Sequence, residues 1–252
     1  MDFTGKTALI TGGTRGIGRA IAEGLASRGA RVAVNYLENS EGAIAALASM
    51  VGGPHVALQA NVSDPEAVEH LFEEAVAALG TIDIVVNNAG IYRYHRVDEV
   101  EFDEWQAAWK EVLDTNLVGP ANVCFHAARH MMEHGGGRIV NVSSRGAFRG
   151  EPEGPAYGAS KAGLNAMSQS LAQRLAPHGI FVGVVAPGFV ETEMGARVLD
   201  GPLGDSVRAQ SPLNRVAHPE EVAYAVLFLA SAGSEFSTGT IIDVNGASYL
   251  RS

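Results

Sequence analysis

The chain has 252 residues, 46% of them apolar and 18% charged, which is typical of a globular protein and excludes collagen-like, disordered and coiled-coil classes. Its formal net charge of −10 opposes any surface that follows nucleic-acid phosphates, so we expect no nucleic-acid partner. The 30 glycines make up about 12% of the chain against a usual ~7%, which indicates that exposed backbone has a role here.

Two further observations bear on the compartment. The longest nearly apolar stretch, Ile180 to Phe189, is shorter than the ~20 residues needed to cross a bilayer, so we expect no membrane span. The single cysteine, Cys124, cannot form an intramolecular disulfide or a zinc knuckle, and the first residues do not resemble a secretory signal. We therefore expect a cytoplasmic protein without a metal site.

Seven short β-branched runs, separated by segments of helical period, predict an alternation of strands and helices. The runs are Thr7 to Thr11, Arg31 to Tyr36, His55 to Ala60, Ile82 to Asn87, Arg138 to Ser143, Ile180 to Val185 and Thr240 to Val244. Several are continuously apolar, as strands buried on both faces are. We predict an α/β fold, a Rossmann-type doubly wound seven-stranded parallel sheet with helices on both faces, formed by residues 1–252 as one domain.

A glycine-rich turn follows the first predicted strand and leads into a helix. It contains Gly12, Gly16 and Gly18. Such a turn lets a pyrophosphate approach the backbone at the positive end of a helix, although a tight turn without a ligand would have the same spacing. The predicted dinucleotide contacts in this turn are Gly12, Thr14, Arg15, Gly16, Ile17 and Gly18.

The end of the second predicted strand bears on the choice between NAD(H) and NADP(H). An acidic residue there would bind a ribose 2′-hydroxyl and repel a 2′-phosphate, but the strand ends in Asn35 and Tyr36. Arg15 can offer a planar set of donors to a phosphate. The sequence favours NADP(H), and NAD(H) stays possible because Glu38 lies close by.

A tyrosine and a lysine four residues apart, Tyr157 and Lys161, share one face of a predicted helix that runs to about Leu175. With 6 tyrosines and 3 lysines in the chain, this pair is far more specific than the glycines. A neighbouring cation favours phenolate, so we expect Lys161 to lower the pKa of Tyr157 for general acid/base catalysis. Ser144 follows the fifth strand, where it could orient a carbonyl or simply cap the strand end.

These motifs together resemble the short-chain dehydrogenase/reductase family in its single-domain form, from Thr4 to about Ala247. The resemblance rests on the glycine turn, Asn87 to Gly90, Asn116, the set of Ser144, Tyr157 and Lys161, and the segment from Pro187 to Thr192. It implies hydride transfer between a nicotinamide and a carbonyl or alcohol. Tyr157 would exchange the proton, Ser144 would orient the carbonyl, Lys161 would hold the ribose, and Asn116 would hold a water in the proton relay.

The resemblance also implies further cofactor contacts. They are Asn61 and Val62 at the adenine, Asn88, Ala89 and Gly90 at the riboses, and Pro187, Gly188, Val190 and Thr192 at the nicotinamide. The family usually has aspartate where this chain has Asn61, and many relatives have two glycines near Asn245. Family members form homotetramers through the helices with Asn116 and Tyr157 and through the last strand, so we expect a homotetramer.

The substrate is less determined. The loop Thr14 to Gly18 and the strand ending at Tyr36 resemble those of 3-oxoacyl-thioester reductases. The net charge of −10 disfavours an acidic carrier protein as a partner. Arginines near the site, such as Arg93 and Arg149, would suit a carboxylate or phosphate on the substrate, or could simply be solvated. Glycines and prolines from about 189 to 217 indicate a flap over the site, or an ordinary long loop.

Two alternative functions stay open at this stage. One is a nucleotide-binding regulator that has the fold without the chemistry, against which the set of Ser144, Tyr157 and Lys161 argues. The other is a dehydrogenase of a different small hydroxy compound, such as a sugar, a steroid or a hydroxy acid. A sugar-nucleotide epimerase would want a larger region after Pro187 than this chain has.

Overall fold

The computed structural model describes residues 1–251. Its centre is one seven-stranded parallel sheet in the order β3-β2-β1-β4-β5-β6-β7, so the predicted doubly wound fold is confirmed. The strands are β1 (Thr7–Ile10), β2 (Arg31–Tyr36), β3 (Val56–Gln59), β4 (Ile84–Asn87), β5 (Gly137–Val142), β6 (Ile180–Pro187) and β7 (Ile241–Val244).

Seven predicted strands appear in the predicted places, with shifted ends. β4 begins at Ile84 instead of Ile82, because the Ile82 N–H donates to the His130 ring and the Asp83 N–H donates to Thr7. β6 is longer than predicted and continues to Pro187, since its last residues pair with β7. These two strand ends, one at each edge of the sheet, therefore differ by two residues from the sequence expectation.

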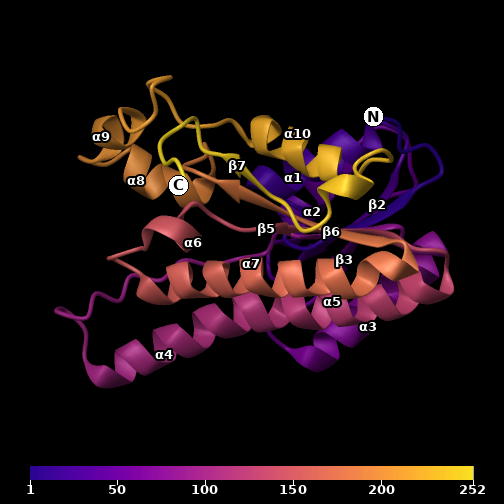
Figure 1. The fold of residues 1–252 in the computed structure, drawn as a ribbon, viewed down its shortest axis with the longest axis horizontal. Coiled ribbons are helices and arrows are strands. Elements are labelled where there is room, and N and C mark those ends of the chain that lie inside the picture. Colours follow the sequence, from indigo (N-terminus) through magenta and orange to yellow (C-terminus); the bar gives the residue numbers. More distant parts are fainter. Residues whose placement is uncertain (252) are drawn as a thin grey trace.

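Helices cover both faces of the sheet (Figure 1). The main ones are α1 (Gly16–Ala26), α2 (Ser40–Ser49), α3 (Pro65–Leu79), α4 (Phe102–Leu113), α5 (Gly119–Glu133), α7 (Pro155–Leu175) and α10 (Pro219–Ala230). The first, second and last of these pack on one face with an apolar core that includes Ile21 and Val226. On the other face, α3, α5 and α7 enclose a second core around Leu71, Met131 and Leu175.

Shorter elements complete the chain. They are α6 (Gly146–Arg149), α8 (Glu193–Leu199), α9 (Gly204–Arg208), a π-helical turn η1 (Asp114–Val118), and the 3-10 turns η2 (Ala176–His178) and η3 (Glu235–Ser237). Because η1 joins α4 to α5 without a loop, the three form one long helix (Figure 1). Among residues 1–251, no helix combines the length and the apolar character that a membrane crossing requires.

The sheet topology fixes where a ligand can bind. β1 lies between β2 and β4, so the chain leaves β1 toward one side of the sheet and β4 toward the other. The crevice at the carboxyl ends of these strands is the usual ligand site of an open α/β sheet. The segment with α8 and α9 forms its own small apolar cluster of Leu199, Val207 and Val216.

Candidate active site

The glycine turn after β1 needs its glycines for two different reasons. Gly12 has a φ of +60°, a conformation that other residues rarely adopt, and a Cβ there would lie 3.0 Å from the Ala89 Cα. At Gly18, a Cβ would lie only 2.1 Å from the Gly12 carbonyl oxygen. The turn thus closes tightly against the first residues of α1 and against the segment after β4.

Polar side chains from neighbouring strands hold this turn. The Asn88 amide donates to the carbonyls of Thr11 and Gly12, at 3.1 and 3.0 Å. The Thr11 hydroxyl accepts from the backbone N–H groups of Asn88 and Ala89, at 3.0 and 3.1 Å. Asn88 and Ala89, predicted as ribose contacts, therefore also fix the shape of the turn. The sequence reasoning gave Thr11 no such role.

The start of α1 has the character of an anion site. Arg15 is its N-cap residue but makes no capping hydrogen bond through its side chain, and the first turn has no acidic residue. The first N–H groups of the helix and the positive end of its dipole are therefore available. Thr14 is buried beside them, and Ile17 is half-buried.

Arg15 also connects the glycine turn to the α8 segment. Its guanidinium lies 2.7 Å from the Glu193 carboxylate, and both side chains are exposed. A Cβ at Gly16 would lie 3.1 Å from the Thr192 methyl group. The beginning of the proposed flap therefore lies directly over the turn, and Arg15 already has an anionic partner there.

The residues predicted on the adenosine side differ in accessibility. Asn35 is only 2% exposed, and its amide accepts from the Gly12 N–H and donates to the Ala60 carbonyl. It supports the turn from its buried side, and its predicted contact with the cofactor stays a prediction. Tyr36 is half-buried, Asn61 is exposed with its oxygen bonded to Ser63, and Val62 is buried.

The four predicted catalytic residues come together at the carboxyl ends of β4 and β5. The Lys161 Nζ donates to the Val142 carbonyl at 2.9 Å and lies 5.8 Å from the centre of the Tyr157 ring. The Tyr157 phenol is hydrogen-bonded to Ser144, whose hydroxyl also accepts from the Gly146 N–H at 3.0 Å. A phenol, a hydroxyl and an ammonium group thus line one side of the crevice.

Asn116 lies in the π-helical turn η1 and is fully buried. Its oxygen accepts from the Ile91 N–H at 2.8 Å, and its amide donates to the Ile91 carbonyl at 2.9 Å. A Cβ at Gly90 would lie 3.3 Å from the Asn116 oxygen and 3.5 Å from the Lys161 Nζ. Gly90 therefore lets Asn116, Lys161 and the segment after β4 approach one another. π-helical turns occur frequently at functional sites.

Burial controls the protonation of the two catalytic groups. It lowers the pKa of Lys161 to about 8 and raises the pKa of Tyr157 to about 12. The hydrogen bond from Ser144 acts in the opposite direction on Tyr157, and the Glu151 charge adds to the rise. Desolvation of the phenolate thus outweighs the effect of Ser144, and Lys161 is not among the groups that shift the pKa of Tyr157. That Lys161 and a positively charged nicotinamide together lower this pKa stays a prediction.

The predicted nicotinamide contacts follow β6. The Pro187 carbonyl accepts from the Arg145 N–H at 2.8 Å, and the Gly188 N–H donates to Val244 at 3.0 Å. Val190 pairs with Ala217 in an isolated bridge, and the Thr192 hydroxyl caps α8 by accepting from the Gly195 N–H. These contacts attach the β6 end both to β7 and to the α8 segment.

His95 is a residue that the sequence reasoning missed. It is 1% exposed, and its Nε2 accepts from the Ala156 N–H at 3.1 Å while its Nδ1 lies 2.9 Å from the Arg93 carbonyl. This pair of bonds assigns the ring proton to Nδ1 and fixes the first turn of α7 at Ala156, the residue before Tyr157. A single histidine in a loop carries no motif, so no sequence signal indicated this role.

The site as a whole fits a nicotinamide dinucleotide. The N-terminus of α1, which has no side-chain cap at Arg15, would hold the pyrophosphate. At Gly12 and Gly90, the absence of a Cβ leaves space close to the backbone. The buried ammonium of Lys161 would face the ribose beside the phenol. The residues of this chain therefore fit a nicotinamide dinucleotide independently of the family resemblance.

Comparisons with known proteins agree with this geometry. Residues 12–247 match the family described as "Enoyl-(Acyl carrier protein) reductase". The chain is 40% identical over 250 residues to the 3-oxoacyl-[acyl-carrier-protein] reductase FabG of Escherichia coli, covering 99% of this chain and 100% of that protein. It is 41% identical over 251 residues to the FabG protein of Aquifex aeolicus, covering 99% of each.

Solved structures give the same result. A short-chain dehydrogenase from Burkholderia cenocepacia in complex with NADP superimposes with a TM-score of 0.89 at 36% identity, covering 98% of this chain and 99% of that one. A dehydrogenase/reductase from Sinorhizobium meliloti has a TM-score of 0.91 at 35% identity, covering 99% and 97%. The likeness therefore extends over the whole sheet and both helical layers.

Proposed function

Because this chain belongs to the short-chain dehydrogenase/reductase family, we propose that it is an NADP(H)-dependent oxidoreductase that interconverts a carbonyl compound and its alcohol. The observation that carries the proposal is the convergence of Ser144, Tyr157 and Lys161 at the carboxyl edge of the sheet. Tyr157 acts as the general acid in reduction and as the general base in oxidation.

The choice of NADP(H) rests on the charges around the glycine turn. The last residue of β2 is Tyr36, so β2 does not end in a carboxylate that would repel a 2′-phosphate. Arg15 is exposed above the turn, where it is paired with Glu193. The relative from Burkholderia cenocepacia is described as a complex with NADP. NAD(H) remains the weaker alternative because Glu38 lies two residues beyond Tyr36.

The roles of the chain's own residues follow from their positions. The dinucleotide, when bound, supplies the hydride that reduces the carbonyl carbon. Ser144 holds the carbonyl oxygen beside the Tyr157 phenol, which gives up its proton to that oxygen as the alcohol forms. Lys161 would hold the ribose, and the Asn116 side chain keeps the segment after β4 in place beside it by bonding to both backbone groups of Ile91. A water held near Asn116 for reprotonation of Tyr157 is what the family resemblance implies.

The protonation state of Tyr157 favours reduction of the carbonyl over oxidation of the alcohol. With a pKa raised to about 12, Tyr157 keeps its proton at neutral pH, as a proton donor must. Oxidation of the alcohol needs the phenolate and is therefore expected to require alkaline conditions. Above a pH of about 8, Lys161 loses its charge, which would weaken its contact with the ribose. Carbonyl reduction near neutral pH is thus the reaction that the residues suit best.

For the substrate, 3-oxoacyl thioesters are the first candidate, supported by the names of the 40% identical relatives. A thioester attached to an acidic carrier protein is a less suitable substrate, because this chain's net charge of −10 repels an acidic protein. The segment from about 189 to 217 would act as a flap, supported by its small separate core and its contact with the glycine turn.

A homotetramer and a cytoplasmic location complete the proposal. The long helix of α4, η1 and α5, which contains Asn116, exposes large apolar side chains that include Val118 and Phe125, and Leu250 is exposed near the C-terminus. Such side chains suit contacts between identical subunits. Light scattering on the purified protein should give four times the chain mass, and Phe125→Lys should reduce it. The one cysteine is free and buried, as a reducing compartment allows.

The direct test is NADPH oxidation by the purified protein with a panel of keto esters, acyl thioesters, quinones, sugars and ketosteroids. We expect turnover with at least one class, and a kcat/KM for NADPH well above that for NADH. NADPH binding without turnover on any class would overturn the proposed activity and would favour a nucleotide-binding regulator.

A further inference from the structure

The loop between β5 and α7, residues 143–154, carries Ser144 at its start and leads into the helix of Tyr157, so it lies beside the proposed reaction centre. Two of its glycines make room for larger side chains. A Cβ at Gly146 would lie 2.3 Å from the Glu151 Oε1, and a Cβ at Gly154 would lie 2.9 Å from the Tyr92 hydroxyl. A side chain larger than glycine at position 146 would clash with the Glu151 carboxylate, and one at position 154 would clash with the Tyr92 phenol. The two glycines therefore allow these groups to pack against the loop.

Glu151 is a half-buried carboxylate that lies against Gly146. No hydrogen bond or ion pair reaches its side chain from the residues that the structure describes. Burial raises the pKa of Glu151, while the more distant charges of Arg149 and Arg145 oppose that rise. A carboxylate that is partly desolvated and unpaired is costly, because it has lost water contacts without gaining donors. Such a group is explained if a ligand brings the donor.

The position of Glu151 places it beside the reaction centre. It lies next to Gly146, whose N–H is bonded to the Ser144 hydroxyl. Its charge raises the pKa of both Tyr157 and Tyr92. A carboxylate here can reach a substrate group adjacent to the carbonyl that Ser144 and Tyr157 hold.

Tyr92 lies against the same loop. Its ring centre lies 5.1 Å from that of Tyr157 and 5.1 Å from that of Tyr94. An aromatic face beside a carboxylate is a surface that packs against C–H groups and accepts hydrogen bonds from hydroxyl or ammonium groups. A long alkyl chain would leave the Glu151 carboxylate desolvated and unpaired.

Most of the arginines that could have favoured an anionic substrate are engaged elsewhere, while Arg149 reaches only Gln210, at 3.5 Å, and its charge acts on Glu151. Arg93 pairs with Glu111, and Arg96 pairs with Asp98 and Glu99. Arg145 is buried, donates to Ser248 and Gln210, and packs over the Phe189 ring. Glu151, whose charge acts on Tyr157, therefore has no hydrogen-bonded or ion-paired cation among the described residues, and this charge disfavours a carboxylate or phosphate next to the carbonyl.

We propose that Glu151, with Tyr92, selects a carbonyl substrate that carries a hydrogen-bond donor, a hydroxyl or an ammonium group, adjacent to the carbonyl. The inference rests on the proposed carbonyl reduction and narrows its substrate class from acyl thioesters toward small polar carbonyl compounds. Glu151 is a specificity-determining residue in this account, and the chemistry itself stays with Tyr157.

The test compares four small ketones that differ only beside the carbonyl. Hydroxyacetone offers a donor, methoxyacetone has similar electron withdrawal without a donor, aminoacetone offers a cationic donor, and pyruvate carries an anion. The kcat/KM with NADPH is measured for each with the wild type, Glu151→Gln and Glu153→Gln. Glu153 lies on the same loop but is exposed, so its variant controls for the loss of one charge. NADPH binding by fluorescence verifies folding.

In the wild type, kcat/KM should be highest for hydroxyacetone or aminoacetone, and the higher of the two identifies the donor. In Glu151→Gln, the ratio of that ketone to methoxyacetone should fall about tenfold, since hydrogen bonds to charged groups contribute about 1.5–3 kcal/mol. Pyruvate reduction should rise, and Glu153→Gln should keep the wild-type ratios.

Equal ratios of kcat/KM in the wild type and Glu151→Gln would overturn the inference about Glu151. Reduction of methoxyacetone in the same experiment would still support the proposed function. A wild type that prefers pyruvate would overturn it as well. Loss of turnover on every carbonyl compound, with NADPH still bound, would instead overturn the proposed function.

Discussion

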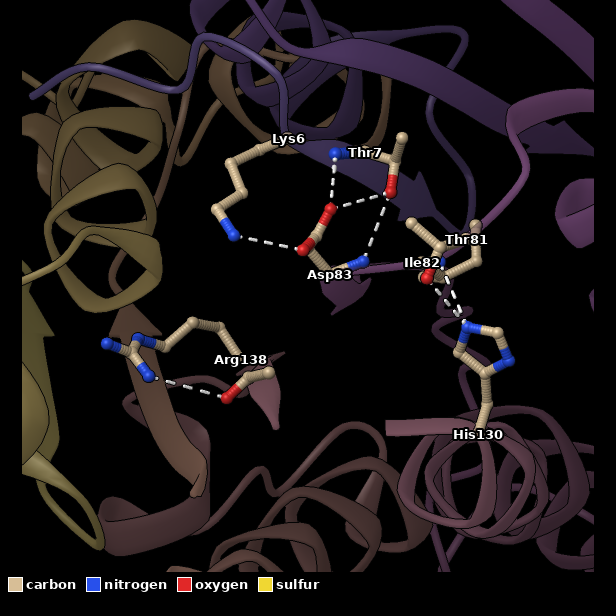
Figure 2. A network of polar contacts seen from close by, with 8 residues as sticks. Lys6, Thr7, Thr81, Ile82, Asp83, His130 and Arg138 are labelled. Atoms are coloured by element: carbon tan, nitrogen blue, oxygen red, sulfur yellow. Dashed lines mark hydrogen bonds and ion pairs between the residues drawn. The ribbon is translucent and has the colours of Figure 1, made fainter. Parts of the chain in front are cut away.

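The polar groups at the two edges of the sheet differ in whether they have hydrogen-bond partners within the chain. At the amino edge, the Asp83 carboxylate accepts from the Lys6 ammonium and from the N–H and hydroxyl of Thr7 (Figure 2). The His130 ring on α5 accepts from the Ile82 N–H at 3.2 Å and lies 3.0 Å from the Thr81 hydroxyl. Nearly every group there has a partner within the chain.

At the carboxyl edge, comparable groups are left available. The N-terminus of α1 is uncapped at Arg15, the pKa of Lys161 is lowered by burial, and Glu151 has no partner among the described residues. Polar groups that lack hydrogen-bond partners or have shifted pKa values mark the place where a ligand binds and supplies those partners. The amino edge therefore serves stability and the carboxyl edge serves chemistry, a contrast that substitutions can test.

The largest effect is expected at the glycine turn. In Gly18→Ala, the new methyl group would lie 2.1 Å from the Gly12 carbonyl oxygen and 2.5 Å from the Asn88 amide, so the turn must open. We expect the Kd for NADPH, measured by fluorescence titration, to rise at least ~100-fold, equivalent to about 3 kcal/mol. Gly24→Ala in the same helix is the control, because its methyl group would meet only flexible side chains. Unchanged NADPH binding in Gly18→Ala would remove the turn from the cofactor site.

At the opposite edge, Asp83→Ala should affect stability alone. It leaves the buried N–H and hydroxyl of Thr7 without their acceptor, which costs about 1–3 kcal/mol of unfolding free energy. Chemical denaturation should show this loss, with Asp83→Asn losing less. The kcat and KM per folded molecule should stay at wild-type values, and a changed KM for NADPH would contradict the separation of the two edges.

A third prediction concerns the ion pair between Arg15 and Glu193. Arg15→Ala should raise the KM for NADPH about tenfold with little change for NADH, because the guanidinium would hold the 2′-phosphate. Glu193→Gln releases Arg15 from its partner at 2.7 Å and should lower the KM for NADPH, by less than about fivefold since exposed pairs are weak. An equal effect of Arg15→Ala on both cofactors would exclude a role in the choice between them.

The smallest effect is expected from His130. Burial and the stacked ring of His134, 3.9 Å away, lower the pKa of His130, so the folded protein holds the neutral ring. The unfolded chain then binds more protons, and stability should fall as the pH drops below the usual histidine pKa of about 6.5. Denaturation midpoints at several pH values should show this fall, and His130→Gln should reduce it. Replacement of the exposed His178 is the control, and the same reduction there would exclude His130 as the cause.

The sequence was sufficient for the sheet and for most of the site because both depend on local patterns. Continuous apolar runs located β1 through β7, and the spacing of Tyr157 and Lys161 placed both on one helix face. The structure brings Ser144, Tyr157, Lys161 and Asn116 together as the resemblance implied.

What the sequence did not reveal depends on contacts between distant segments. The support of the turn by Asn35, the bond from Ala156 to His95 and the isolation of Glu151 all arise across strands or loops. The pKa of Tyr157 was expected to fall, since a neighbouring lysine is visible in the sequence while the extent of burial is not. The π-helical turn that holds Asn116 has no sequence signature of its own.

The most direct test of the account is the Tyr157→Phe variant, which removes one oxygen and keeps the ring. Its kcat/KM for carbonyl reduction and its Kd for NADPH are measured on the same preparation. We predict that kcat/KM falls at least ~100-fold while the Kd for NADPH changes by less than about twofold, because the phenol transfers the proton without carrying the cofactor. Turnover close to the wild-type rate in Tyr157→Phe would contradict the assignment of the carboxyl edge as the site of acid/base chemistry.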